Sequence, residues 1–486
     1  RFENQPTRTL CREDGRLSRM TQVHDLAILG GGPAGYATAL RATQLGLDVA
    51  LVEEKEVGGT CLHRGCVPTK AWLQAAKIRA TVAKADRLGI GAILTGVDAA
   101  KVRSFADSVV SGLHRGLTGL IRSRGIRVFP GHGRLVVDAE GPALDVDGEL
   151  LRAHNIVLAT GSAPVTLGLP TDGERILTSD HALRLEQLPG RAVILGGGVI
   201  GVEFASLWRD LGVDVVLVEA APHLLPNEDP DLVAMLERRL RDRDVELRLG
   251  EKAEGIVRDG DQVRLQLSEE IITADVALIA VGRRPLTSGL GLEEAGVALT
   301  STGHVSTTRE LATTIARVFA VGDLVVGPQL AHRGYAHGIF LAEHLAHLMG
   351  GRPIRPCPPE DRDIPRITYS SPQFASVGMT REQAAATGGC EFSDFDLRGN
   401  ARALMLTPGD RDAGLVRVVR RPDGPVVGVH VVGDEIAELI AEGTLMVGWQ
   451  ATPNDVKDLI HPHPSLSEAL AEANLALAGS ALHMHT

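Results

Sequence analysis

Two cysteines, Cys61 and Cys66, stand five residues apart in the Gly-rich segment GGTCLHRGCVPTK. Thiols at this spacing can form a redox-active disulfide that exchanges with a substrate. The alternatives are a structural disulfide or two small buried thiols. We expect a helix over residues 67–87, with Pro68 at its first position, where a missing N–H costs nothing. Cys66 would then lie at the helix N-terminus, where the helix dipole and Lys70, one turn further on, lower the thiol pKa.

A dinucleotide-binding pattern ends only a few residues before this segment. The apolar run over residues 23–30 predicts a strand, and the pattern G-x-G-x-x-G then opens a helix to about residue 45. A second expected strand, residues 48–52, ends in an acid that can accept hydrogen bonds from a ribose. The glycines allow a tight turn, the approach of a pyrophosphate and helix packing. These positions are Gly30, Gly32, Gly35 and Glu53. The alternative is a βαβ unit that binds no ligand.

The same unit occurs a second time in the chain. Residues 27–53 align without a gap on residues 193–219, with 14 identities in 27 positions. Two such units predict two dinucleotides, most simply FAD and a nicotinamide. The first unit leads into the cysteines, which a flavin must touch, so we assign FAD to it and the nicotinamide to the second unit. A carboxylate at Glu219 would repel a 2′-phosphate, which favours NAD over NADP. The expected NAD contacts are Gly196, Gly198, Val199, Ile200, Gly201 and Glu219.

The composition excludes several classes of protein. The chain has 486 residues, enough for about three domains. Its formal net charge of -11 argues against nucleic-acid binding, and no run of about 18 apolar residues predicts a membrane span. Five cysteines are too few for a secreted disulfide framework, so we expect a reducing, cytoplasmic location. We predict no metal site.

The cysteine segment resembles the redox-active disulfide of the flavin-dependent pyridine nucleotide-disulfide oxidoreductases. The string GGTCLHRGCVPTK is similar to the dihydrolipoyl dehydrogenase branch of that family. The resemblance implies an α/β fold with two Rossmann-like dinucleotide-binding domains, for FAD and NAD, and a C-terminal α+β dimerisation domain. The expected parts are the FAD-binding domain (20–155 and 284–355), the NAD-binding domain (156–283), the interface domain (356–486) and a disordered extension (1–19).

The resemblance also implies further cofactor contacts. The segments IVLATGS and AVGRRP are similar to the two crossings between the FAD and NAD domains, and Gly282 in the second is an expected NAD contact. By itself, Asp323 could equally be a helix N-cap. The further residues expected at the FAD are Lys70, Gly133, Thr160, Gly161, Ser162, Asp323, Gln329, Leu330, Ala331 and His332.

A second chemical segment, HPHPSLSE, lies near the C-terminus. By itself, a histidine beside a proline is usually a surface residue. The segment resembles the family's catalytic one, which makes His463 the acid–base and Glu468 the carboxylate that orients it. His461 is the less favoured candidate for the base, with a supporting role as its alternative. The family places this pair in the active site of the partner subunit. It also pairs Lys70 with a Glu beside the flavin, a position that Glu203 matches.

The resemblance implies an NAD-dependent dehydrogenase acting on protein-bound dihydrolipoamide. It also implies that Cys61 is the exposed sulfur that exchanges with the substrate, and that Cys66 lies against the flavin. The implied assembly is a homodimer with shared active sites, and the implied partner is the lipoyl domain of the acyltransferase in 2-oxo-acid dehydrogenase complexes. The alternatives are a glutathione- or mycothiol-type disulfide reductase and an idle scaffold subunit. Mercuric reductase is excluded because it needs a further cysteine pair near the C-terminus, and this chain has no cysteine after Cys390. Soluble transhydrogenase is excluded because it lacks a pair like Cys61 and Cys66.

Overall fold

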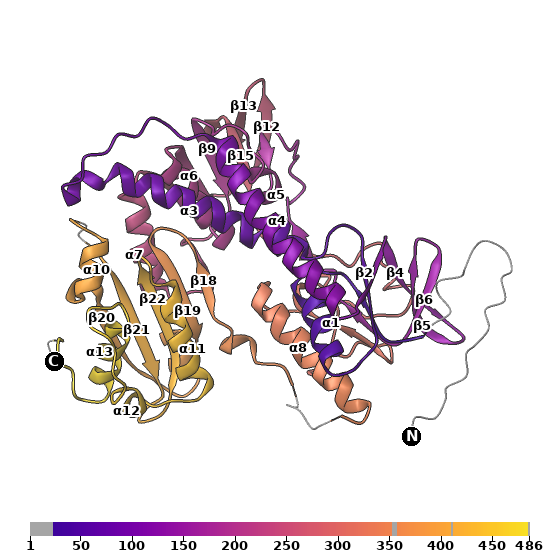
Figure 1. Ribbon diagram of the computed structural model, residues 1–486. Coiled ribbons are helices and arrows are strands. Elements are labelled where there is room, and N and C mark those ends of the chain that lie inside the picture. Colours follow the sequence, from indigo (N-terminus) through magenta and orange to yellow (C-terminus); the bar gives the residue numbers. More distant parts are fainter. Residues whose placement is uncertain (1–22, 352–356, 410–411, 485–486) are drawn as a thin grey trace.

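The computed structural model describes residues 23–351, 357–409 and 412–484, so the extension expected at residues 1–19 lies outside them. Figure 1 shows three parts. The first nucleotide unit forms the part on the right, the second unit forms the upper left part, and the C-terminal domain forms the lower left part. Among the described residues, no helix is both long and apolar enough to cross a membrane.

The first part is built on a parallel sheet with an antiparallel extension. The strand order is β3-β2-β1-β6-β5-β4, and β17 also pairs with β6. The central strands are almost fully buried, as is typical of parallel sheets with both faces covered. The strands are β1 (His24–Leu29), β2 (Val49–Glu53), β3 (Arg127–Pro130), β4 (Gly133–Asp138), β5 (Gly141–Val146), β6 (Glu149–Leu158) and β17 (Val318–Ala320).

Five helices accompany this sheet. α1 packs along α8, and an ion pair of 2.6 Å between Arg41 and Glu343 joins them. The helix expected over residues 67–87 is shorter, because α3 begins at Cys66 and a separate turn, η1 (Ala85–Leu88), follows it. Pro68 is therefore third in the helix, where an N–H would still lack an intrahelical partner. The helices are α1 (Pro33–Gln44), α2 (Gly59–His63), α3 (Cys66–Ala83), α4 (Ala99–Ser123) and α8 (Ala331–Leu348).

The second part repeats the architecture of the first. Its parallel sheet has the order β11-β10-β9-β15-β8, and α6 follows β9 as α1 follows β1. The antiparallel sheet β12-β13-β14 packs on one face, and α6 and α7 pack on the other. The elements are β8 (Ile176–Leu177), α5 (Ser179–Ala182), β9 (Arg191–Leu195), α6 (Val199–Leu211), β10 (Asp214–Glu219), α7 (Pro230–Arg241), β11 (Val245–Leu249), β12 (Gly255–Asp259), β13 (Gln262–Gln266), β14 (Ile271–Ala274) and β15 (Val276–Ile279).

Two short antiparallel strands, β7 (Ser162–Pro164) and β16 (Arg283–Pro285), carry the chain between the two parts. The domain boundary differs here from the one expected between residues 155 and 156. β6 continues in the first sheet to Leu158, because its last residues pair with both β1 and β17. The chain therefore leaves the first sheet after β6, and not within it.

The C-terminal domain is an antiparallel sheet of order β18-β19-β22-β21-β20 with helices around it. A short 3₁₀ turn, η5 (Ala437–Leu439), leads directly into α11, and the last helix, α13, begins at Glu468. The remaining elements are η2 (Gly322–Leu324), η3 (Asp361–Asp363), β18 (Arg366–Thr368), β19 (Gln373–Gly378), α9 (Arg381–Ala386), β20 (Glu391–Asp396), η4 (Leu397–Gly399), α10 (Ala401–Leu406), β21 (Gly414–Arg420), β22 (Val426–Gly433), α11 (Ile440–Gly448), α12 (Pro453–Val456) and α13 (Glu468–Leu477).

Candidate functional site

The thiol pair lies where two helices meet. Cys61 is in the short helix α2, and Cys66 is the first residue of α3. Both are free thiols, so the structure shows the dithiol state. Cys66 is exposed and Cys61 is half-buried, which is the reverse of the order expected for the exchanging sulfur. In contrast, the pKa of Cys66 is the lower of the two, which agrees with the thiolate expected at Cys66.

A hydrogen bond between the two sulfurs shifts their pKa values in opposite directions. The Cys61 thiol donates this bond to Cys66, which raises the pKa of Cys61, and burial raises it further. The same bond lowers the pKa of Cys66 to about 7, with burial opposing and the positive charge of Lys70 supporting the change. At neutral pH the reduced pair therefore holds a thiol at Cys61 and a substantial fraction of thiolate at Cys66.

Lys70 and Glu203 form a partly buried ion pair beside Cys66. The Lys70 Nζ donates to both carboxylate oxygens of Glu203, each at 2.8 Å, and Glu203 is only 4% exposed. Burial lowers the pKa of Lys70, but the carboxylate of Glu203 outweighs it and the net shift is upward. The structure thus brings together Lys70 from α3 and Glu203 from α6, the pairing that the family resemblance implies. The ammonium of Lys70 remains charged next to the thiols.

A cavity of about 240 Å³ opens directly beside Cys61. The hydroxyls of Tyr36 and Tyr335 lie 2.5 Å apart on its wall, and the rest of the lining is largely aliphatic. The sequence patterns did not indicate these tyrosines, because neither belongs to a recognised motif and they come from different helices. The lining residues are Tyr36, Gly58, Cys61, Leu62, Val67, Leu113, Leu117 and Tyr335.

The first glycine pattern forms an open cradle at the N-terminus of α1. Gly30 has φ +106°, and a Cβ on Gly35 would lie 1.8 Å from the Gly30 carbonyl oxygen, so both positions require glycine. Gly32 is the N-cap of α1, and no side chain caps this end. The Glu53 carboxylate accepts a 2.6 Å bond from the N–H of Gly31 and still has free lone pairs. This uncapped helix end suits a pyrophosphate.

The second glycine pattern reproduces this geometry at α6. Gly196 has φ +104°, a Cβ on Gly201 would lie 1.8 Å from the Gly196 oxygen, and Gly198 is the uncapped N-cap. The Glu219 carboxylate accepts bonds of 2.5 Å from the N–H of Gly197 and 2.6 Å from that of Ala221. Val199 and Ile200 form the first turn of α6. The structure therefore contains two equivalent dinucleotide cradles, each with an acid at the end of the second strand.

The segments that follow each cradle converge at the crossing strands. Ser162 Oγ donates to Asp323 at 2.6 Å and accepts a 2.8 Å bond from Arg283. Thr160 donates to the carbonyl of Leu286, and Gly161 accepts from the N–H of the same residue. Asp323 is therefore held in place by the crossing strands at the edge of the first sheet.

The remaining expected contacts differ in how well they suit a cofactor. A Cβ on Gly133 would lie 2.5 Å from Leu29, so its backbone lies close to β1. Gln329 has a buried side-chain nitrogen without a hydrogen-bond partner, and Leu330 and Ala331 form the uncapped start of α8. In contrast, the His332 ring lies 2.7 Å from the Pro365 carbonyl and is turned toward the C-terminal domain. Gly282 has φ +130° and open space around it.

His463 and Glu468 form the expected pair at the start of α13. His463 Nδ1 lies 2.8 Å from Glu468 Oε1, and the second carboxylate oxygen accepts from the N–H of Ser465. Burial alone would raise the pKa of Glu468. The two hydrogen bonds lower it by more than burial raises it, so the net shift is downward. The neighbouring His461 is bound to Glu442 at 2.8 Å, which raises its pKa.

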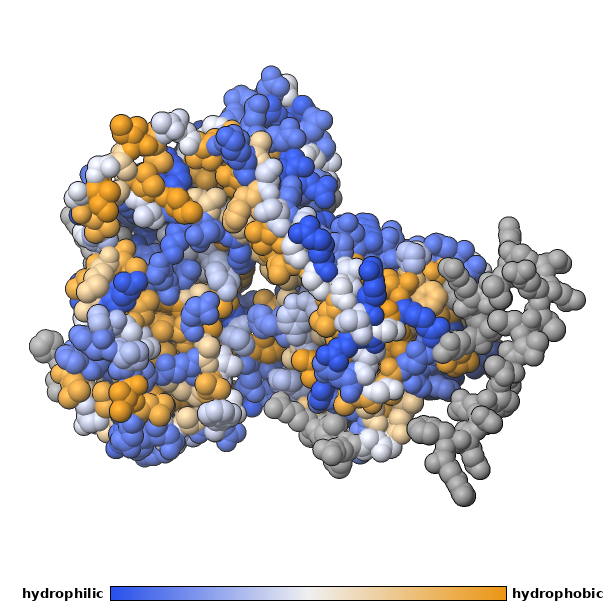
Figure 2. Space-filling view, viewed as in Figure 1, coloured by the Kyte–Doolittle hydropathy of each residue, from blue (hydrophilic) through white to orange (hydrophobic). Residues whose placement is uncertain are grey.

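The structure does not bring His463 to the thiols of its own chain. α13 packs on β20, β21 and α12, whereas α2 and α3 pack against α4 and α6. The His463 side chain is 75% exposed. Large apolar residues of the same domain are exposed too, including Ile460 at 98% and Trp449 at 77%. Figure 2 shows further apolar surface over the C-terminal domain and over the segment between α3 and α4.

Within the described part of the chain, no group of three or more His, Cys, Asp or Glu side chains could hold a metal ion.

Comparisons with known proteins point to one family. The family model described as pyridine nucleotide-disulphide oxidoreductase matches residues 24–338, and the dimerisation domain of the same family matches residues 364–474. A dihydrolipoyl dehydrogenase from Bacillus subtilis is 36% identical over 96% of this chain and 100% of that protein. One from Thermus scotoductus is 37% identical over 95% of this chain and 99% of that protein.

Solved structures agree with the sequence relatives. LpdA from Mycobacterium tuberculosis has a TM-score of 0.86 at 28% identity, covering 94% of this chain and 100% of its own. The HOCl-induced flavoprotein disulfide reductase RclA from Escherichia coli has a TM-score of 0.80 at 27% identity, covering 93% of this chain and 99% of its own.

Proposed function

Because this chain belongs to the pyridine nucleotide-disulphide oxidoreductase family, we propose that it is a dihydrolipoyl dehydrogenase. It oxidises the dithiol of a dihydrolipoyl group to the cyclic disulfide, and NAD+ is the electron acceptor. The observation that carries this proposal is the thiol pair, in which Cys66 begins a helix, has a pKa of about 7 and adjoins the partly buried ion pair of Lys70 and Glu203. FAD and NAD are the cofactors of the family.

The thiol pair carries out the exchange steps. In the oxidised enzyme Cys61 and Cys66 form a disulfide, and a substrate thiolate attacks the sulfur of Cys61. The bond between the two cysteines breaks, and Cys66 leaves as the thiolate, which its low pKa favours. The second substrate thiol then attacks the substrate sulfur of the mixed disulfide and displaces Cys61, which becomes a thiol. The electron pair of the substrate now resides in the reduced cysteines.

A base must take the protons of the substrate thiols, and His463 of the partner subunit suits this role. His463 is exposed, paired with Glu468 and remote from the thiols of its own chain. The carboxylate fixes the tautomer of the ring and stabilises the imidazolium that forms when it accepts a proton. The exposed apolar residues around it, such as Ile460, suit burial in a dimer of the kind that the matched dimerisation domain forms.

The two cradles hold the two cofactors. The first cradle, with Gly30, Gly32, Gly35 and Glu53, leads directly into the thiol pair and would hold FAD. The second, with Gly198 and Glu219, would hold NAD. Bound FAD supplies the two-electron chemistry that connects the cysteine dithiol with NAD+. The open N-terminus of α6 and the carboxylate of Glu219 bind and orient the nucleotide, and that carboxylate rejects a 2′-phosphate.

The cavity beside Cys61 supports a lipoyl group as the substrate. Its aliphatic lining from α2, α3 and α4 suits a hydrocarbon chain that ends in two thiols. A protein-bound lipoyl group has this form, which points to the lipoyl domain of the acyltransferase in 2-oxo-acid dehydrogenase complexes as the macromolecular partner.

Steady-state kinetics test the proposed function. We expect the purified enzyme to turn over with dihydrolipoamide and NAD+, and to prefer NAD+ over NADP+ by at least about tenfold in kcat/KM, which corresponds to roughly 1.4 kcal/mol. Glu219→Ala should reduce this preference. Turnover with glutathione disulfide and NADPH in place of dihydrolipoamide and NAD+ would instead identify a reductase of the glutathione type. A protein inactive with both pairs would be the scaffold subunit.

The variants Gly32→Ala and Gly198→Ala are expected to separate the two cofactors. Among the described atoms, a Cβ on Gly32 comes no closer than 4.0 Å to its neighbours, and one on Gly198 meets nothing within 4 Å. Their φ angles of -71° and -73° also suit alanine, so both variants should fold. The new methyl group would occupy the space that a pyrophosphate needs. We expect Gly32→Ala to lose bound flavin absorbance, and Gly198→Ala to keep it but raise the KM for NAD+ at least about tenfold.

Thermal unfolding supplies the control for these variants. Gly201→Ala places its Cβ 1.8 Å from the Gly196 oxygen and should lower the melting temperature, whereas Gly198→Ala should not. Loss of flavin from Gly198→Ala, or a Gly32→Ala protein that keeps its flavin and has a raised KM for NAD+, would contradict the assignment of the two cradles.

A further inference from the structure

All three parts of the protein meet at the carboxylate of Glu203. Glu203 lies on α6 of the second part, and its Oε1 accepts from Lys70 of the first part at 2.8 Å. The same oxygen accepts a 3.0 Å bond from the backbone N–H of Tyr369, which follows β18 in the C-terminal domain. Glu203 is 4% exposed, so its position is determined by these partners and not by water.

The ring of Tyr369 makes a second contact with the same pair. The Lys70 Nζ lies 4.7 Å from the centre of this ring. An ammonium at this distance over an aromatic face is attracted by the ring electrons, and more strongly where water is excluded. Tyr369 therefore contacts the ammonium of Lys70 through its ring and the carboxylate of Glu203 through its backbone.

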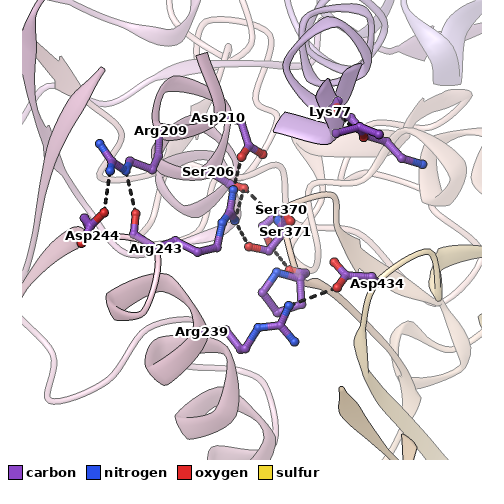
Figure 3. A network of polar contacts seen from close by, with 12 residues as sticks. Lys77, Ser206, Arg209, Asp210, Arg239, Arg243, Asp244, Ser370, Ser371 and Asp434 are labelled. Atoms are coloured by element: carbon purple, nitrogen blue, oxygen red, sulfur yellow. Dashed lines mark hydrogen bonds and ion pairs between the residues drawn. The ribbon is translucent and has the colours of Figure 1, made fainter. Parts of the chain in front are cut away.

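The segment that carries Tyr369 is fastened along one face of α6. Glu203, Ser206 and Asp210 share this face, because residues three to four apart lie above one another on a helix. The N–H of Ser371 donates to Ser206 at 2.8 Å. Figure 3 shows Arg243 bound to Asp210, Ser206 and the carbonyl of Ser371 at once.

Two further ion pairs hold the C-terminal domain against its neighbours. Arg239 of α7 binds Asp434 at 3.1 Å, as Figure 3 also shows. Lys77 of α3 binds Glu435 at 2.6 Å. The backbone at residues 369–371 thus has little freedom to move away from α6, and the ring of Tyr369 is carried by a well-fastened segment.

We propose that Tyr369 is a positioning residue that holds the ion pair of Lys70 and Glu203 beside Cys66. Through this contact the C-terminal domain sets how strongly the ammonium stabilises the Cys66 thiolate. The inference deepens the proposed function and rests on it, because that function uses Cys66 as the thiolate. Tyr369 acts through Lys70 and need not touch the substrate or the reacting sulfur.

The charges around Cys66 give the direction of the effect. The groups that act on this thiol are Cys61 on α2, Lys70 on α3 and Glu203 on α6. Lys70 lowers the pKa of Cys66 and Glu203 raises it. The phenols of Tyr335 and Tyr369 also lie near enough to interact with it. If the ammonium of Lys70 moves away from Cys66, it stabilises the thiolate less, and the pKa of Cys66 rises.

The pH dependence of Cys66 alkylation tests this inference. The reduced holoenzyme is treated with iodoacetamide across neutral pH, and labelling of the Cys66 peptide is followed by mass spectrometry. The wild-type midpoint is expected near 7. Tyr369→Leu should raise this midpoint, so that labelling below it slows by about two- to tenfold, the range of one cation–π contact. Tyr369→Phe keeps the ring and should behave as the wild type.

A double-mutant cycle shows whether Tyr369 acts through Lys70. Lys70→Met should raise the midpoint, and adding Tyr369→Leu to it should cause no further change. A wild-type midpoint in Tyr369→Leu, or an equal further rise in the Lys70→Met background, would overturn the proposal. If Tyr369→Leu does not fold, Tyr369→Met fills the same space without an aromatic face and gives the same test. The assay needs no substrate, so its outcome is independent of turnover with dihydrolipoamide.

Discussion

Cys61→Ser protein is expected to lose oxidation of dihydrolipoamide by at least about 10⁴-fold, as enzymes do when the group that bonds covalently to substrate is removed. A serine oxygen cannot form the disulfide that the substrate thiolate attacks, so neither exchange step can take place. The serine hydroxyl can still donate a hydrogen bond to Cys66, as the Cys61 thiol does. The Cys66 thiolate should therefore persist, with an alkylation midpoint near 7.

Turnover and Cys66 labelling are measured on the same preparation. Cys66→Ser should be equally inactive, because it lacks the leaving thiolate. Cys390→Ser is the matched control, since this half-buried thiol lies 3.5 Å from the Arg381 carbonyl in the C-terminal domain and should leave turnover unchanged. Residual activity of Cys61→Ser close to that of the wild type would disprove the exchange mechanism. A raised labelling midpoint would instead show that the serine does not replace the sulfur as a donor.

The two nucleotide units illustrate what the sequence could predict. Their strands, glycines and terminal acids follow one local pattern, and each pattern spans fewer than thirty residues. The structure places Glu53 and Glu219 in equivalent positions, where each carboxylate accepts from the middle glycine of its own loop. Local periodicity and turn chemistry determine such units, so no long-range information is needed to find them.

Other features depend on contacts that no local pattern contains. Tyr369 reaches Glu203 through its backbone N–H, which every residue except proline possesses, so its side chain gave no signal. The ring of His332 contacts the carbonyl of Pro365, which lies in a different domain and is absent from any motif around His332. The half-buried state of Cys61 likewise reflects α2 packing against α3 and α4, which the Gly-rich composition of the segment did not predict.

His463→Ala is expected to lower turnover by about 10² to 10⁴-fold, the usual cost of a lost general base. Its partner in the reaction should be the thiol pair of the other subunit, because His463 is exposed and its helix packs away from α2 and α3. This variant retains its cysteines and the Cys61→Ser variant retains its histidine. Each homodimer is inactive for a different reason. One variant lacks the thiol pair and the other lacks the base, and these two parts of an active site come from different subunits.

Mixing the two inactive variants should restore activity. When subunits exchange, a mixed dimer contains one site with intact cysteines and an intact His463 of the partner subunit, and a second site that lacks both. Random pairing at equal ratio makes about half the dimers mixed, each with one working site, so activity should return to about a quarter of wild type. A mixture of Cys61→Ser with Cys66→Ser is the matched control and should remain inactive, since neither chain has a complete thiol pair. If native mass spectrometry detects mixed dimers of Cys61→Ser and His463→Ala without recovered turnover, His463 does not serve the cysteines of the partner.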